Sequence, residues 1–290
     1  MTRSGWPAAA FEAHRPHLRG VAYRMLGSIA EADDAVQETW LRTTRIELDE
    51  VQDLRAWLTT VVARVALDML RARAARREDS HRVHVPDPIV TPVGSATPEE
   101  EALTADAVGL ALLVVLDRLG PNERLAFVLH DIFGVPFDQI GQITGRSAAA
   151  ARQLASRARR RVRYDPSVPV AGHARQRQVL DAFLAAARGG DVGALVSLLD
   201  PDVVLHADAG ADAARTQTVR GADAVAGQAR RYAGLAASAR PVLVNGMPGL
   251  LAAPDGHPFA IFAVALRDDR IAQIDIIADP DRLRRLGITG

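Results

Sequence analysis

The 290-residue sequence contains no cysteine and no lysine, and only 4% of its residues are aromatic. Without cysteine the chain can form no disulfide, iron–sulfur cluster, thiolate zinc site or catalytic thiol. Its longest apolar run, Ala107–Leu116, is shorter than the about 18 residues that a membrane-spanning helix needs. The segment Met1–Gly20 also lacks the apolar core of a signal peptide. We therefore expect a cytoplasmic protein with no membrane partner.

What the sequence does contain is a globular composition with segregated charge. Hydrophobic residues make up 48% of the chain, which excludes a disordered protein and suggests roughly two domains. The 35 basic residues, all arginine, balance 35 acidic ones, but Glu31–Asp53 is acidic whereas Arg55–Arg82 and Arg146–Arg163 are basic. This pattern favours local contacts with different partners. Arginine suits phosphate and guanine recognition, although genome composition is the preferred explanation for its exclusive use.

Hydrophobic periodicity and proline placement predict several domains. We expect a helical domain over 8–79, a proline-rich linker over 80–102, a second helical domain over 103–164, a hinge over 165–172 and an α+β domain over 173–290. In the last domain, helices on one face of an antiparallel sheet are expected. Its predicted strands are Val203–His206, Ala239–Val244, Phe259–Arg267 and Ile271–Ala278, with a tight hairpin at Asp268-Asp269-Arg270.

The segment Phe137–Val162 has the pattern of a helix-turn-helix. Ile140 and Ile143 share one face of a short helix, Gly145 permits a sharp turn, and Ser147 can cap the next helix. That second helix buries a stripe of Ala151, Leu154, Ala155 and Ala158. The residues expected at base edges are Arg146, Ser147, Ala148, Ala149, Arg152, Gln153 and Arg157, and Arg157, Arg159, Arg160 and Arg161 are expected at phosphates. An ordinary helical hairpin with a solvated arginine face is the alternative.

Both helical domains resemble the extracytoplasmic-function sigma factors of bacterial RNA polymerase. Ala22–Ser28, Ala32–Arg42, Ala56–Leu58 and Leu67–Arg71 are similar to that family's region 2, and Asn122-Glu123-Arg124 and the helix-turn-helix are similar to its region 4. The resemblance implies a non-enzymatic factor that reads −10 and −35 promoter elements and binds core RNA polymerase at its flap and at the clamp of its largest subunit. No cofactor or metal is expected, and the pairs His14/His17 and His81/His84 are interpreted as surface histidines.

Two surfaces of the first domain are assigned roles by this resemblance. A predicted helix over Glu31–Arg42 has an exposed acidic face, which fits a protein partner better than DNA. Its expected contacts with polymerase are Asp34, Gln37, Glu38 and Leu41. The polar stretch Ile46–Asp53 and the arginine-rich helix after it are expected at the −10 element. The arginines expected there are Arg55, Arg64, Arg71, Arg73, Arg76 and Arg77.

The segment 173–290 resembles the SnoaL-like group of the NTF2-like superfamily, a cone of curved sheet and helices around a pocket. The whole chain thus resembles a multidomain subgroup in which two all-α sigma domains, regions 2 and 4, precede such an α+β domain. Val85-Pro86-Asp87-Pro88 and Asp279–Leu283 resemble the linker motif and the terminal motif of this subgroup. Asp208–Asp212 departs from its glycine-rich loop. The resemblance implies that the C-terminal domain regulates the sigma domains, by activation or by inhibition.

Two other functions stay open from the residues themselves. One is a conventional helix-turn-helix repressor or activator that binds duplex DNA without polymerase. The other is a cyclase-like or isomerase-like enzyme with a DNA-binding appendage, because the same fold hosts such enzymes. Acid–base chemistry or a small-molecule ligand would use pocket residues, and the candidates are His206, Asp208, Tyr232, His257 and Asp275.

Overall fold

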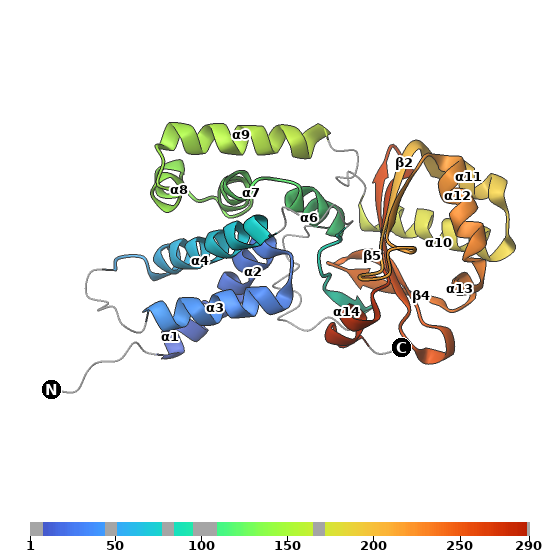
Figure 1. Ribbon diagram of the computed structural model, residues 1–290, viewed down its shortest axis with the longest axis horizontal. Helices are drawn as coiled ribbons and strands as arrows, with labels where there is room; N and C mark the ends of the chain where they lie inside the picture. The colour runs from blue at the N-terminus through green and yellow to red at the C-terminus, as the bar shows by residue number, and fades with distance from the viewer. Residues whose placement is uncertain (1–7, 44–50, 77–83, 95–108, 165–171, 289–290) are drawn as a thin grey trace. The chain divides into compact units, whose positions relative to one another are not determined.

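The computed structural model describes residues 8–43, 51–76, 84–94, 109–164 and 172–288, and the chain divides into two compact units (Figure 1). Unit 1 comprises 1–80, 101–106 and 116–161, and unit 2 comprises 81–100, 107–115 and 162–290. The segment expected to link the two sigma domains therefore groups with the C-terminal domain. No helix in the described ranges is long and apolar enough to cross a membrane.

The first part of unit 1 is a helical bundle. It consists of α1 (Ala8–Glu12), α2 (Arg15–Leu26), α3 (Ile29–Thr43) and α4 (Leu54–Arg76). Apolar side chains of α2, α3 and α4 are fully buried between the helices, among them Leu18, Ala35 and Leu58. Helix α2 ends where Gly27 takes a left-handed conformation with φ 73°, as a glycine allows.

The second part of unit 1 contains the predicted helix-turn-helix. Pro121 begins α7 (Pro121–Phe127), as expected of a proline in the first helical turn. The helix continues as the π-helix η2 (Val128–Ile132), and a left-handed Gly134 follows it. Then come α8 (Phe137–Thr144) and α9 (Ala148–Tyr164). Helix α6 (Leu110–Asp117), most of which belongs to unit 2, precedes them in the sequence.

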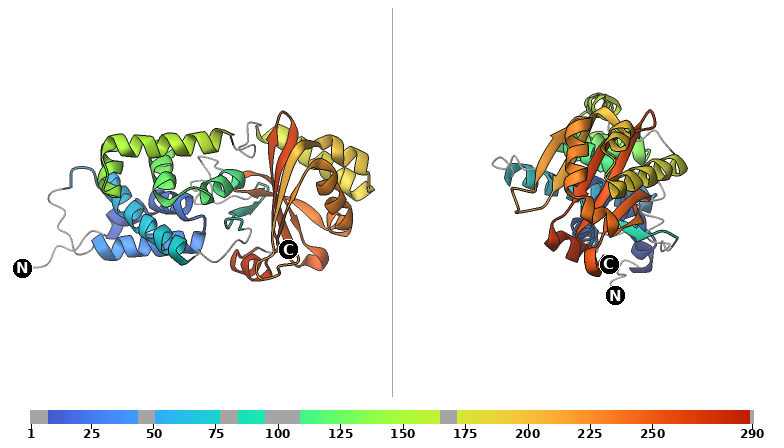
Figure 2. Two further views of the ribbon diagram at one scale, coloured as in Figure 1. Left: turned by 45° about the horizontal axis from the view of Figure 1, so that its top comes forward. Right: turned by 90° about the vertical axis from the view of Figure 1, so that its right-hand side faces the viewer.

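Unit 2 is a seven-stranded sheet with helices on one face (Figure 2). The strand order is β1-β4-β5-β6-β7-β2-β3. The strands are β1 (Val90–Pro92), β2 (Leu199–Asp208), β3 (Gln217–Arg220), β4 (Ala239–Val244), β5 (Met247–Ala252), β6 (Ala260–Arg267) and β7 (Arg270–Ile277). All four predicted strands are present. The expectation of a purely antiparallel sheet is corrected, because β2 and β7 are parallel.

The helices of unit 2 are α10 (His173–Gly189), α11 (Val192–Leu198), α12 (Ala222–Arg231), α13 (Ala233–Ala237), α14 (Pro280–Arg285) and the short 3-10 helix η3 (Pro254–Gly256). Side chains of α10, α11 and α12 pack with those of β2, β6 and β7 in one hydrophobic core. Leu195 and Val225 are fully buried in that core. The helical layer therefore covers one face of the sheet (Figure 1).

Two tight turns fix the register of the antiparallel strands. Asp268 and Asp269, with φ of 48° and 64°, form the predicted hairpin between β6 and β7. Asn245 and Gly246, with φ of 52° and 75°, join β4 to β5. Positive φ at both central residues is typical of the type I′ turn, whose backbone twist matches that of the strands.

Candidate DNA-binding and regulatory sites

The helix-turn-helix is built around a close approach of two backbones. A Cβ atom on Gly141 of α8 would lie 2.7 Å from the carbonyl oxygen of Arg146, so only glycine fits there. Gly145 ends α8 in the left-handed conformation with φ 69°. The Ala150 amide donates to the Ser147 hydroxyl at 3.2 Å, which caps α9 as expected. These contacts fix the angle at which α9 leaves the turn.

The outer face of α9 carries the predicted recognition residues. Ala151, Ala155 and Ala158 are fully buried and Leu154 is half-buried, so the predicted stripe faces inward. Ala148 is half-buried, whereas the other candidates are exposed, namely Arg146, Ser147, Ala149, Arg152, Gln153 and Arg157. The Arg152 guanidinium lies 5.2 Å from the centre of the Phe137 ring. This cation–π contact orients the exposed side chain of Arg152 near the start of α9.

The four arginines predicted at phosphates differ in their contacts. Arg159 forms an ion pair with Asp131 at 2.6 Å, and Arg161 forms one with Glu123 at 2.9 Å. Within the described part of the chain, Arg157 and Arg160 form no ion pair. Because exposed ion pairs are weak, phosphate can replace the two carboxylates at small cost.

Helix α3 presents the expected acidic face. Asp34 and Gln37 are exposed, and 51% of Leu41 is accessible to solvent although it is a large apolar side chain. Glu38 pairs with Arg42 at 2.8 Å, one helical turn further on. An exposed leucine surrounded by polar groups is a common feature of protein-binding surfaces.

The arginines predicted at the −10 element lie along α4. Arg64 donates to the Gln142 carbonyl at 3.4 Å, and Arg71 donates to the Asn122 side chain at 3.1 Å. Arg73 forms an ion pair with Glu31 and donates to the Leu26 carbonyl at 3.0 Å. In this conformation, binding a phosphate would require these contacts to be exchanged. Arg76 is the last residue of α4, whereas Arg77 and most of Ile46–Asp53 lie outside the described residues.

The sixth arginine, Arg55, contacts a histidine that the sequence suggested to be a surface residue. His17 is half-buried, with its Nε2 atom 2.9 Å from the Thr59 hydroxyl and its Nδ1 atom 3.2 Å from Arg55. Burial and the charge of Arg55 lower the pKa of His17 from 6.5 to about 4. The imidazole is therefore neutral at physiological pH.

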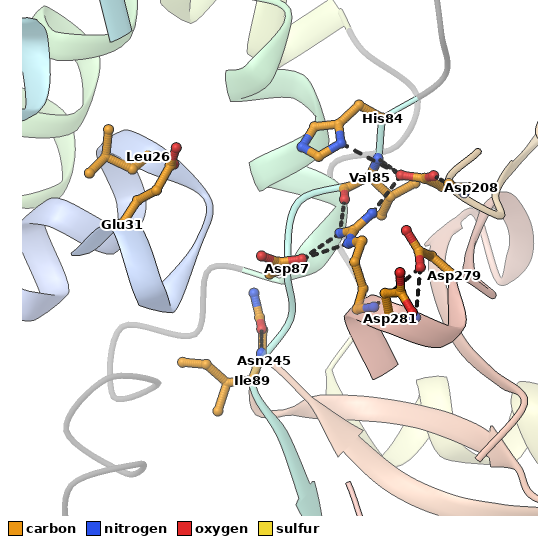
Figure 3. Close-up of polar contacts among 12 residues, drawn as sticks. Leu26, Glu31, His84, Val85, Asp87, Ile89, Asp208, Asn245, Asp279 and Asp281 are labelled. Atoms are coloured by element: carbon orange, nitrogen blue, oxygen red, sulfur yellow. Dashed lines mark hydrogen bonds and ion pairs between the residues drawn. The ribbon is translucent and has the colours of Figure 1, made fainter. Parts of the chain in front are cut away.

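In unit 2, the linker motif, the end of β2 and the terminal motif meet at one arginine, Arg282 (Figure 3). Arg282 of α14 is 7% exposed and donates from Nη1 to Asp208 at 2.6 Å. It also donates from Nε to Asp87 at 2.7 Å and hydrogen bonds to the Val85 carbonyl. These contacts tie the segment 84–88 to both β2 and α14. We call this group, Arg282 with Val85, Asp87 and Asp208, the linker clamp.

The carboxylate in the linker clamp is held in its charged form. Burial alone would raise the pKa of Asp208, but hydrogen bonds from His84 and the Val85 amide and the charge of Arg282 lower it to about 2. The Gly210 amide donates to the same carboxylate at 3.0 Å. A Cβ atom on Gly210, where φ is 64°, would lie 2.2 Å from Asp279. One glycine of the divergent loop therefore retains a steric role.

Just after the clamp, the linker becomes an edge strand of the sheet. Strand β1 pairs antiparallel with β4, and Val90 lies opposite Val244. The Ile89 amide donates to the Asn245 side chain, and the Asn245 amide donates to the Ile89 carbonyl, both at 2.7 Å. The sequence pattern gave no sign of this strand, although Asn245-Gly246 is a strong hairpin signal.

A cavity of about 120 Å³ lies between the helices and the sheet of unit 2. Tyr232 lines it, as expected, but His206, Asp208, His257 and Asp275 do not. For His206, Asp208 and Asp275 the reason is strand alternation, since the lining residues of β2 are Leu205 and Ala207 and those of β7 are Ile274 and Ile276. Of the five candidate pocket residues, Tyr232 is thus the one that lines this cavity.

His206 and Asp275 form a pair on the opposite face of the sheet. They lie side by side in the β2–β7 register, with Nδ1 and Oδ1 3.0 Å apart, and both are buried. Gln273 donates to both oxygens of Asp275, at 2.8 and 2.6 Å. These partners satisfy a buried carboxylate, which is a structural role. His257 is exposed in the segment between η3 and β6.

Two family models and several relatives match this chain. Residues 10–76 match the family model described as Sigma-70 region 2, and residues 109–162 match the one described as Sigma-70, region 4. In an alignment of 289 positions that covers 94% of this chain and 91% of the relative, the sequence is 41% identical to the ECF RNA polymerase sigma factor SigJ of Mycobacterium tuberculosis. It is 36% identical to the probable sigma factor SigI of the same species, covering 95% of this chain and 94% of that protein.

A solved structure extends this similarity to the fold. The crystal structure of M. tuberculosis SigJ matches with a TM-score of 0.74 and 39% identity, over 96% of this chain and 98% of that one. The similarity thus includes the C-terminal sheet and helices as well as the two helical regions. This chain belongs to the extracytoplasmic-function sigma factors, which direct RNA polymerase to specific promoters.

Proposed function

We propose that three surfaces of unit 1 divide the work of promoter-directed initiation. The exposed face of α3 binds the clamp of core RNA polymerase, the arginines of α4 contact the −10 element, and the start of α9 reads the −35 element while its domain binds the flap. The charge distribution supports this division, because the α3 face is acidic and would repel DNA, whereas α9 is rich in arginine. Such a complex forms in the cytoplasm.

We further propose that the C-terminal domain restrains initiation through the linker clamp. The observation that carries this proposal is the binding of residues 84–92 to the rest of unit 2, by Arg282 at one end and by the pairing of β1 with β4 at the other. These residues connect region 2 to region 4. While they are docked, less free chain separates the two regions, and fewer arrangements let both reach their promoter elements together.

Transcription by an Asp87→Ala variant tests this restraint. The change removes a linker carboxylate that faces Arg282, while Asp208 still compensates the buried guanidinium. We expect transcription from a −10/−35 promoter to rise several-fold, since coupling between sites commonly amounts to about 1–3 kcal/mol. The control is Asp281→Ala on α14, the helix of Arg282, which removes an exposed carboxylate that pairs with Arg284. Unchanged or reduced transcription by a folded Asp87→Ala protein would show that docking does not restrain initiation.

We propose that the C-terminal domain performs no catalysis and that a small molecule binds its cavity. Among the residues described, those that line the cavity include no aspartate, glutamate or histidine. The enzyme alternative needs such a group, and the His206–Asp275 pair lies on the other face of the sheet. The repressor or activator alternative is distinguished by tight binding to duplex DNA in the absence of polymerase.

A further inference from the structure

The wall of the cavity in unit 2 is mainly apolar, and its polar residues are Arg215, Gln217, Gln228 and Tyr232, of which Arg215 and Gln228 each present a group that a ligand can bind. Its lining comes from α10, α12, α13 and the adjoining strands and is mainly aliphatic and aromatic, with Phe183, Leu250 and Phe262 among the larger side chains. A cavity of similar size, ~150 Å³, is known to accept benzene in another protein. Tyr232, which is 42% exposed, lies where the cavity meets the solvent. The space therefore suits an aromatic ring or a short branched chain.

The first polar group is the guanidinium of Arg215. It lines the cavity and lies 4.9 Å from the centre of the Phe259 ring, which is also part of the lining. Within the described ranges no carboxylate forms an ion pair with it. A half-buried arginine held over an aromatic ring, with its donors unpaired by protein carboxylates, is suited to bind an anionic group in a bidentate manner.

The second polar group is the side-chain amide of Gln228 on α12. Its Oε1 atom is buried and has no hydrogen-bond partner among the residues that the structure describes. Leaving a buried acceptor without a donor costs free energy, so such atoms in proteins usually have a partner. A hydroxyl or N–H group on a bound molecule would supply the missing donor.

We propose that this cavity binds a small carboxylic acid with an apolar ring or chain and a hydrogen-bond donor, its carboxylate at Arg215 and its donor at Gln228. As a regulatory site it rests on the proposed control by the C-terminal domain; as a binding site it does not. One segment of the chain, 208–217, contributes to both the linker clamp and the cavity. Asp208 belongs to the clamp, whereas Ala209, Arg215 and Gln217 line the cavity.

The test uses hydroxylated aryl acids as probes, from 4-hydroxybenzoate to 3-(4-hydroxyphenyl)propanoate. Calorimetric titration of the full chain should give saturable binding of at least one acid. The amide of that acid and its analogue without the hydroxyl should each bind about tenfold more weakly, as loss of one charge-assisted or buried hydrogen bond predicts. If no acid in the series binds, or if acid and amide bind equally, the proposal is overturned.

Two variants assign the contacts. Arg215→Met keeps the apolar contact with Phe259 and should abolish the preference for the acid over the amide. Gln228→Met should abolish the preference for the hydroxylated probe. The control is Arg220→Met on β3, an exposed arginine outside the cavity lining, which should bind like the wild type. Preferences that survive in the Arg215 and Gln228 variants would place the probe elsewhere and overturn the assignment.

Transcription measured with the same probe separates this proposal from the proposed function. If the linker clamp reports occupancy, the probe changes transcription by the wild type but not by Asp87→Ala. Binding with the expected preferences, without any effect on transcription, leaves the site in place and contradicts regulation through the linker. Loss of the preferences, with the Asp87→Ala effect intact, contradicts the site and leaves the linker restraint in place.

Discussion

The Arg282 guanidinium donates to the Asp208 carboxylate at 2.6 Å across 74 positions of sequence, and both side chains are more than nine-tenths buried. Asp208→Asn would leave the buried cation with Asp87 as its remaining charged partner. Breaking a buried ion pair costs about 3–5 kcal/mol. The free energy of unfolding of unit 2, measured in urea by hydrogen exchange of the amides in β2 and β7, should therefore fall strongly. Asp202→Asn, an exposed change on the same strand, should have little effect. Equal stability of the two variants would contradict this account of the clamp.

Acid should destabilise unit 1 through His17. Its pKa is lowered from 6.5 to about 4, chiefly by burial, so the unfolded chain takes up a proton in this range while the folded chain does not. The free energy of unfolding should therefore decrease as the pH falls from 6.5 toward 4, by less than about 1 kcal/mol per pH unit because the side chain is partly solvated.

Tryptophan fluorescence makes this measurement specific for unit 1. All three tryptophans, Trp6, Trp40 and Trp57, fall within residues 1–80. His17→Gln should remove most of the pH dependence between pH 7 and pH 5, whereas His257→Gln, an exposed change in unit 2, should leave it unchanged. A wild-type slope that persists in His17→Gln would assign the acid sensitivity to other groups.

The sequence predicts much of unit 1 because local signals dominate there. Helical periodicity, Gly145 and Ser147 locate the helix-turn-helix, and the structure confirms the turn and the cap. The buried stripe of α9 follows from the same periodicity. None of these features depends on residues that are distant in sequence.

Unit 2 is harder to predict because its key contacts are long-range. Nothing near Val90 in the sequence indicates its pairing with Val244. Likewise, the residues around Asp208 do not indicate that its carboxylate forms a buried ion pair with Arg282. Chemical type alone does not locate the cavity, because strand alternation places His206 and Asp275 on the face opposite Ala207 and Ile276.

Binding to polymerase should depend on the acidic face of α3. We expect Glu38→Ala to weaken the affinity for core RNA polymerase by about 1–2 kcal/mol, as removal of a contributing interface residue typically does. The control is Glu12→Ala at the end of α1, because Glu12 also belongs to an exposed ion pair with a nearby arginine, Arg15, at 2.7 Å. Equilibrium binding of labelled protein to polymerase measures the affinity. If Glu38→Ala instead changes the choice of −35 sequence, the assignment of this face is contradicted.

Promoter selectivity should depend on Arg152 in a way that differs from general DNA affinity. Arg152 is exposed near the start of α9 and oriented by Phe137, so a base contact is expected. Arg152→Ala should weaken binding of the holoenzyme by about 1–3 kcal/mol and relax specificity at one position of the −35 element. Arg160→Ala, further along the helix, should weaken all sequences alike and lower the slope of affinity against salt by about one. Competition among single-base promoter variants at two salt concentrations measures both effects, and an Arg152→Ala profile like that of Arg160→Ala would make Arg152 a phosphate contact.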